Sequence, residues 1–189
     1  MNEIEPGDAG VLFVGGSRKV SRLHPLVRDL LDAAIDAGET VVVGDANGAD
    51  KAVQAFFADK HYANVIVFHS GDRWRNRLAP WETRAVASGE RGFRFYTAKD
   101  RAMAHEATRG LMIWDGESKG TLLNAVRLLG AGKAATIFRS PDKAIVELSD
   151  HDDWRRFSRD LPAELVETVE SEYDLETKND AGTRQASLF

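Results

Sequence analysis

Short apolar runs alternate with amphipathic segments along most of this chain, and the alternation constrains the fold more than any other feature. Runs typical of buried parallel strands occupy residues 10–16, 40–44, 64–69, 110–116 and 133–139. The segments between them carry apolar residues on one helical face, as in residues 22–38. Strands that alternate with helices form a parallel sheet covered on both faces. We therefore predict an α/β, Rossmann-like, doubly wound fold with a mainly parallel sheet of about six strands.

The remaining elements follow from weaker patterns. We expect helices over residues 48–60, 99–109, 119–132 and 150–161 and another from about Pro80, together with a short strand at 93–97 and an edge strand at 144–148. Residues 1–160 then make one domain. Residues 161–189 carry seven acidic and two basic side chains, and we predict a largely disordered acidic tail that ends in "QASLF".

Composition excludes several classes of protein. The chain has no cysteine, which rules out disulfides and thiolate metal sites and suits a reducing compartment, so we expect a cytoplasmic protein. No apolar run is long enough to span a bilayer, so we expect no membrane partner. The net charge of −5 belongs to the tail, which leaves 23 basic and 23 acidic residues in 1–160. A neutral body argues against a dedicated duplex-DNA binder, while a local basic groove stays open.

Three strands end in glycine-bearing polar turns that open helices, namely "GGSRK" (15–19), "GDANGAD" (44–50) and "DGESKGT" (115–121). The carboxyl ends of parallel strands share one edge of the sheet, so the turns converge there. Helix N-termini attract phosphate, and glycine lets a ligand approach the backbone. We predict a nucleotide-like ligand and no other required cofactor. The candidate ligand-binding residues are Gly15, Gly16, Ser17, Arg18, Gly44, Asp45, Asn47, Gly48, Asp115, Ser118, Lys119, Gly120, Thr121 and Asn124.

These residues have different expected roles. Asp45 and Asn47 are candidates for contacts with ribose hydroxyls or a base edge, while Asp50 is expected to cap the second helix. Lys119 is either a phosphate contact or a solvated lysine. The segment "DRWRNR" (72–77) is either a lid that stacks on a base or a loop held by salt bridges. The five histidines show no metal-ligand spacing, so we expect no metal site.

The first two turns and their strands, "VLFVGGSRKVS" and "VVVGDANGADKAVQAF", resemble the first half of the SLOG superfamily, which includes DprA and the LOG phosphoribohydrolases. Residues 98–124 resemble its second half, with Lys99, Asp100 and Met103 matching the pattern at the start of a helix. The resemblance covers about residues 10–140. It implies a Rossmann-like fold and a nucleotide-derived ligand, and names no single activity within the superfamily.

One residue departs from the pattern of the LOG enzymes, whose "GGxGTxxE" turn carries a glutamate for N-glycosidic cleavage. Asn124 stands at that position here, and an amide cannot act as a carboxylate base. Three hypotheses stay open: a nucleotide binder, with a sensor role left open, without LOG-type hydrolysis; an N-glycosidic hydrolase or transferase related to LOG or deoxyribosyltransferase enzymes, with Asp115 as its catalytic candidate; and a DprA-like accessory of DNA processing.

The last five residues, "QASLF" (185–189), resemble the pentapeptide with which many bacterial proteins dock on the replication sliding clamp. Gln185, Leu188 and Phe189 match its glutamine and its apolar pair. Such short motifs insert apolar side chains into a pocket of their partner. The resemblance implies a sliding clamp as a partner. The sequence leaves a homodimer open as well.

Overall fold

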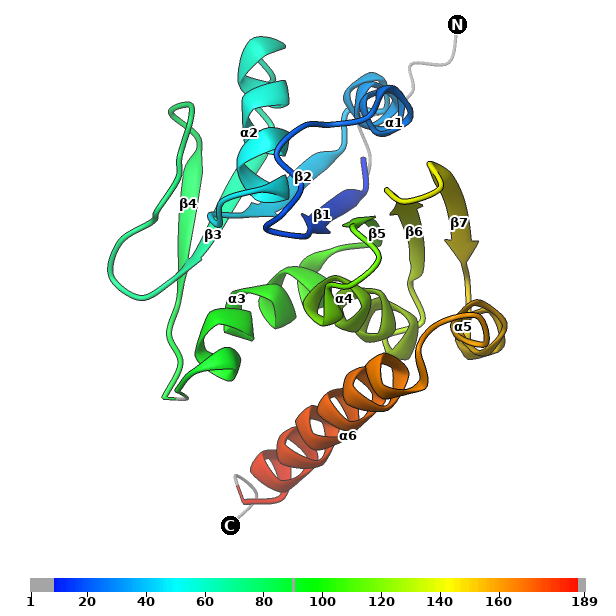
Figure 1. The fold of residues 1–189 in the computed structure, drawn as a ribbon. Coiled ribbons are helices and arrows are strands. Elements are labelled where there is room, and N and C mark those ends of the chain that lie inside the picture. Colours follow the sequence, from blue (N-terminus) through cyan, green and yellow to red (C-terminus); the bar gives the residue numbers. More distant parts are fainter. Residues whose placement is uncertain (1–8, 90, 187–189) are drawn as a thin grey trace, which may run out of the picture.

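The computed structural model describes residues 9–89 and 91–186, with the backbone alone at 93 and 180–186, and it contains a seven-stranded sheet between layers of helices (Figure 1). The strand order is β4-β3-β2-β1-β5-β6-β7. The strands are β1 (Val11–Gly16), β2 (Thr40–Gly44), β3 (Val65–Ser70), β4 (Glu82–Val86), β5 (Arg109–Trp114), β6 (Ala134–Arg139) and β7 (Ala144–Leu148). All pairs are parallel except β6 with β7. The predicted doubly wound α/β fold is confirmed, with seven strands rather than about six.

Helices cover both faces of the sheet because its central strands are apolar on both sides. Leu12 and Val14 of β1 belong to the core under α1 (Pro25–Asp36) and α2 (Ala49–Asp59). Phe13 points to the opposite core, under α3 (Phe93–Glu106) and α4 (Lys119–Gly130). Two C-terminal helices, α5 (His151–Ser158) and α6 (Ala163–Ala186), lie against α4 (Figure 1).

The chain reverses its direction across the sheet at β1. It runs outward from β1 through β2 and β3 to β4, and then returns to the other side of β1 as β5. The chain after β1 therefore leads to α1 on one face of the sheet, and the chain after β5 leads to α4 on the other face. In open α/β sheets this switch point, outside the carboxyl ends of the strands, is where ligands bind.

Two local predictions are wrong. The segment after Pro80 forms the edge strand β4 instead of a helix, and residues 93–97 form the start of α3 instead of a strand. β4 has no apolar run because its outer edge faces solvent, and its Arg84 bonds Glu106 of α3 at 2.6 Å. The aromatic residues of 93–97 favour a strand locally, but tertiary packing overrides such weak propensities.

The prediction of a largely disordered tail is also wrong. Residues 163–186 form the helix α6, which packs along α4. Val169 is 1% exposed, and Tyr173 lies so close to Gly130 that any side chain at Gly130 would collide with its hydroxyl. The prediction failed because the acidic composition of residues 161–189 outweighed a narrow apolar stripe, which is made of Leu165, Val166, Val169 and Tyr173.

The structure describes only part of the C-terminal pentapeptide. Gln185 lies within the bounds of α6, where the structure describes the backbone alone, and Leu188 and Phe189 lie outside the described residues. The resemblance to the clamp-docking motif therefore stays a prediction. No helix among the described residues combines the length and apolar character needed to cross a bilayer.

Candidate functional site

A cavity of about 540 Å³ opens at the switch point, outside the carboxyl ends of β1 and β5. Its size suits a small organic ligand. The turn after β1 forms one wall, and the turn after β5 with the start of α4 forms a second. Side chains of α3 complete it, namely Tyr96, Thr97, Lys99, Asp100 and Met103.

Ten of the fourteen candidate residues line this cavity. They are Gly15, Gly16, Ser17, Arg18, Asp115, Ser118, Lys119, Gly120, Thr121 and Asn124. The four candidates from the turn after β2, namely Gly44, Asp45, Asn47 and Gly48, do not line it, although Ala46 and Asp50 of the same turn do. The predicted convergence therefore holds for the first and third turns, and the second turn has a different role.

A hydrogen bond joins the two turns that line the cavity. Ser17 Oγ donates to Asp115 Oδ2 at 2.6 Å, and Asp115 Oδ1 accepts from the backbone N–H groups of Glu117 at 3.0 Å and Ser118 at 2.8 Å. Burial raises the pKa of Asp115, but these three donors outweigh it and hold that pKa below the usual value. Asp115 is therefore an ionised carboxylate whose two oxygens already have donors.

The turn after β2 is bonded to the turn after β1 and packs closely against it. Ala49 N–H donates to Ser17 O at 3.0 Å, and Ser17 N–H donates to Ile113 O at 3.0 Å. Gly48 has φ +81°, and a Cβ there would lie 2.2 Å from Arg18 O. Only glycine fits this close contact between the turns. Gly48, which suggested a third ligand contact, packs the second turn against the first, and Gly44 is packed against Asp50 and Lys99.

Asp45 is a correction to the predicted site. Its carboxylate is 1% exposed and accepts from Arg75 three times: from the backbone N–H at 2.9 Å, from Nε at 3.1 Å and from Nη2 at 2.7 Å. Burial raises the pKa of Asp45, but the bonds from Arg75 and the charge of Lys99 lower it below the usual value. Asn47 likewise accepts from Asn76 at 3.0 Å. Both side chains bind the protein itself instead of facing the cavity.

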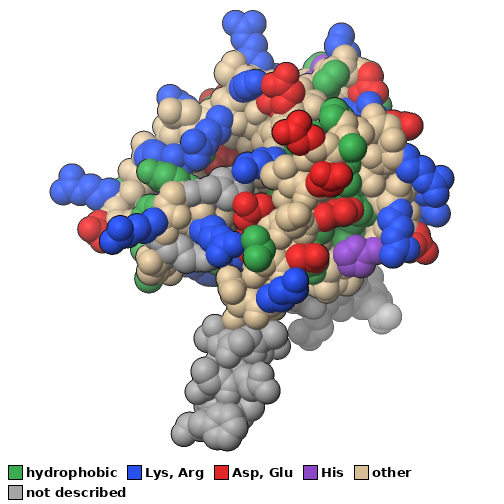
Figure 2. Space-filling model, turned by 60° about the horizontal axis from the view of Figure 1, so that its bottom comes forward, with side chains coloured by type: hydrophobic (Ala, Val, Ile, Leu, Met, Phe, Trp, Pro, Cys, Tyr) green, Lys and Arg blue, Asp and Glu red, His purple; other side chains and the backbone are tan. Residues whose placement is uncertain are grey.

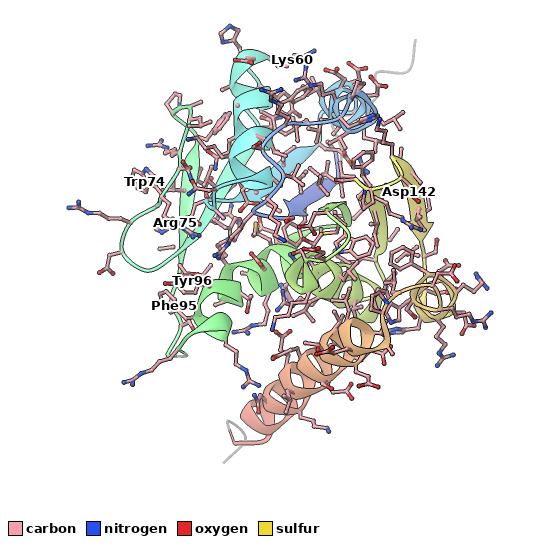
Figure 3. The ribbon with its side chains drawn as sticks, in the orientation of Figure 1. Lys60, Trp74, Arg75, Phe95, Tyr96 and Asp142 are labelled. Atoms are coloured by element: carbon pink, nitrogen blue, oxygen red, sulfur yellow. The ribbon has the colours of Figure 1, made fainter. Side chains whose placement is uncertain are left out.

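The arginine-rich segment 72–77 is therefore a loop held by a salt bridge. Figure 3 shows Arg75 on this loop and Tyr96 below it, at the start of α3. Tyr96 is 49% exposed, and the guanidinium carbons of Arg18 and Arg75 each lie 5.9 Å from its ring centroid. The Tyr96 ring thus lies at the cavity and next to two cations.

The start of α4 presents backbone to the cavity. Ser118 Oγ caps the helix by accepting from Thr121 N–H at 3.4 Å and from Thr121 Oγ1 at 2.9 Å. Gly120 lines the cavity, and a Cβ built on it would meet no atom within 4 Å. The first turn of a helix carries a partial positive charge on its backbone N–H groups. This wall can therefore receive an anionic group at close range.

Sequence reasoning missed a buried charged cluster at the other end of the cavity. Lys99 is 5% exposed, and its Nζ lies 3.0 Å from Asp100 Oδ1 and 3.6 Å from Asp50 Oδ2. Burial lowers the pKa of Lys99, but the neighbouring carboxylates outweigh it and the pKa is raised. Burial raises the pKa of Asp50, against the charge of Lys99. Lys99 and Asp100 matched the SLOG pattern, but only the packing of α3 on the sheet shows that they meet Asp50.

The charges around the cavity balance. Four cationic side chains line it (Arg18, Lys19, Lys99 and Lys119), and four acidic ones do too (Asp50, Asp100, Asp115 and Glu117). On the face shown in Figure 2, basic side chains lie along both the left and right sides and acidic ones lie across the centre. Such a cavity suits a ligand that carries an anionic group together with neutral polar groups.

Comparisons of the chain with models of known protein families, with curated proteins and with solved structures find no match. The resemblance to the SLOG superfamily therefore rests on the quoted motifs. Among the described residues, no three histidine, aspartate or glutamate side chains are grouped so that they could hold a metal ion.

Proposed function

We propose that this protein binds a nucleotide or nucleotide-derived ligand in the cavity between β1, β5, α3 and α4, a role that fits a sensor. One observation carries the proposal: the backbone of Gly120, in the first turn of α4, has open space beside it and forms a wall of a cavity of about 540 Å³ at the switch point of the sheet. A phosphate group suits this wall because the N–H groups of a helix start attract anions.

The rest of the cavity suits the other parts of a nucleotide. The exposed ring of Tyr96 offers a face on which a base can stack. The carboxylate of Asp100 and the ammonium of Lys99 offer an acceptor and a donor for hydroxyl groups. Arg18 lies beside Tyr96, and its guanidinium adds a positive charge for phosphate to the N–H groups at the start of α4.

N-glycosidic cleavage has less support. Asn124 lines the cavity where LOG enzymes carry a glutamate, and it has no carboxylate with which to act as a base. Asp115 is the remaining candidate, but three donors occupy its oxygens and lower its pKa. We expect no free base to be released from AMP, which chromatography after incubation with the protein tests. Turnover that Asp115→Asn abolishes would favour the enzyme hypothesis.

A ligand panel tests the proposed function. Thermal unfolding is recorded with AMP, ADP, NAD, ADP-ribose and cyclic nucleotides, each alone. A ligand present at 100 times its dissociation constant stabilises the folded state by about 2.7 kcal/mol, which is a clear rise in the unfolding temperature. A rise with at least one of these compounds supports the proposal, and no rise with any of them contradicts it.

A further inference from the structure

The orientation of the Asn124 side chain is fixed by a neighbouring cation. Asn124 is 4% exposed, lines the cavity and accepts a hydrogen bond from Arg127 Nη1 through Oδ1 at 2.5 Å. A guanidinium only donates, so the amide oxygen must face Arg127 and the NH₂ group must face away. The structure gives Asn124 Nδ2 no acceptor among the described residues.

Arg127 is itself held by the C-terminal helix. Its Nε and Nη2 donate to the two carboxylate oxygens of Glu176 at 2.9 and 2.5 Å, and both side chains are buried, at 6% and 8% exposure. Arg101 Nη1 lies 3.6 Å from the same carboxylate. A bidentate pair of this kind fixes the guanidinium plane. Glu176 of α6 therefore fixes the orientation of the Arg127 side chain, and Arg127 in turn fixes the orientation of the Asn124 amide.

We infer that Asn124 is a donor-only recognition residue for the ligand and that Arg127 and Glu176 are its positioning residues. The inference rests on the proposed function. Asn124 follows Gly120 by four residues and so lies on the same face of α4, one turn further along. A ligand whose phosphate lies at Gly120 therefore meets the amide with the next part of its structure, which in a nucleotide is the ribose. Asn124 donates to one of its oxygen atoms.

The same arrangement explains why a carboxylate would fail at this position. An ionised side chain at residue 124 would keep the bond to Arg127 but would present only acceptor oxygens to the cavity. It would repel the phosphate and leave the ligand oxygen without a donor. We therefore expect the protein to fold with either asparagine or aspartate at residue 124. Asparagine presents a hydrogen-bond donor to the ligand, whereas aspartate presents an acceptor.

The substitution Asn124→Asp isolates this effect, because aspartate has the shape of asparagine and retains an acceptor for Arg127. Calorimetric titration with AMP measures the affinity, and Asn64→Asp, an exposed residue outside the cavity, controls for the change in net charge. We expect Asn124→Asp to bind AMP at least roughly tenfold more weakly, the size of an unsatisfied hydrogen bond. Asn64→Asp should bind like the wild type, and the unfolding temperatures of all three proteins should agree within a few degrees.

A second variant tests the positioning role. Glu176→Gln removes the charge that holds Arg127 and lies outside the cavity. We expect it to weaken AMP binding roughly three- to tenfold, the size of one weakened hydrogen bond, and to add little to the loss in the double variant with Asn124→Asp. A purely structural role for Glu176 predicts equal losses in both backgrounds, which would contradict the positioning role.

The outcomes separate this inference from the proposed function. If the wild type binds AMP and Asn124→Asp binds it equally well, the donor role is wrong while the nucleotide site stands. If the wild type shows no heat with AMP, the inference fails, and the ligand panel above then decides whether the proposed function fails with it.

Discussion

Ser17 Oγ donates to Asp115 Oδ2 at 2.6 Å and so ties the turn after β1 to the turn after β5, across the switch point of the sheet. The two residues are separated by 98 positions in the chain. Their bond holds the two walls of the cavity at a fixed separation. Ser17 and Asp115 are both candidate ligand-binding residues that line the cavity. Each already has a hydrogen-bond partner in the protein, so each has a structural role there.

Removing the hydroxyl of Ser17 should weaken the fold at this point. Ser17→Ala leaves Asp115 Oδ2 without its short bond, and we expect the free energy of unfolding to fall by about 1–3 kcal/mol. Urea unfolding followed by circular dichroism measures the change. Ser21→Ala, at an exposed serine four residues later, is the matched control and should unfold like the wild type. Equal stability of the two variants would show that the bond contributes nothing.

The Asp45–Arg75 pair should make stability depend on acid pH. The folded-state pKa of Asp45 lies below its ordinary value of 3.8. A lowered pKa stabilises the fold above pH 3.8, and the gain disappears as the pH falls through that value toward the folded-state pKa. Arg75 is partly exposed, so solvent limits the gain to the order of 1 kcal/mol.

Asp45→Asn should therefore lose stability at pH 7 and lose less relative to the wild type at about pH 3. Urea unfolding at the two pH values measures this difference. Asp36→Asn, an exposed aspartate at the end of α1, serves as the control and should behave like the wild type at both. A loss that is the same at pH 7 and pH 3 would be inconsistent with the lowered pKa.

Much of the fold could be predicted because the central strands are apolar on both faces. β1, β2, β3, β5 and β6 coincide with the predicted runs to within one or two residues. The errors lie at the periphery. β4 is a polar edge strand, and the first turn of α3 is rich in aromatic residues, which have strand propensity. In both places the local pattern is weak and contact with the rest of the fold decides the structure.

The candidate site was predictable for a related reason. Glycine-bearing turns after β1 and β5 must share one edge of a parallel sheet, so their residues meet at the cavity. The sequence does not show that the carboxylate of Asp45 pairs with Arg75, thirty residues later. Nor could it place Glu176 behind Arg127, since the acidic composition around Glu176 predicts disorder. Such long-range pairs depend on packing and leave no local signal.

The helix α6 should contribute to the stability of the domain. Val169 is 1% exposed between α6 and the rest of the core, and Val169→Ala removes two buried methyl groups. We expect a loss of about 2 kcal/mol in the free energy of unfolding. Glu167→Ala, an exposed residue on the same helix, should cost far less. A negligible effect of Val169→Ala would indicate that α6 is undocked in solution.

Tyr96 should contribute to nucleotide affinity through its ring. Stacking of a base on an aromatic side chain is worth about 1–3 kcal/mol by alanine substitution. Tyr96→Ala should therefore weaken AMP binding by at least fivefold, while Tyr96→Phe, which keeps the ring, should bind nearly as well as the wild type. Calorimetric titration distinguishes the two variants. Comparable losses in both would instead assign the contact to the hydroxyl group.

The most direct test of the nucleotide site changes Gly120. A side chain there would meet no atom of the protein within 4 Å at Cβ, so Gly120→Val should fold normally while its methyl groups enter the space proposed for phosphate. Gly89→Val is the matched control, because Gly89 is exposed, has equally open surroundings and does not line the cavity. The measurement is calorimetric titration of the wild type and both variants with AMP. We predict binding by the wild type and Gly89→Val and none detectable by Gly120→Val. Unchanged affinity in a folded Gly120→Val protein would contradict the account.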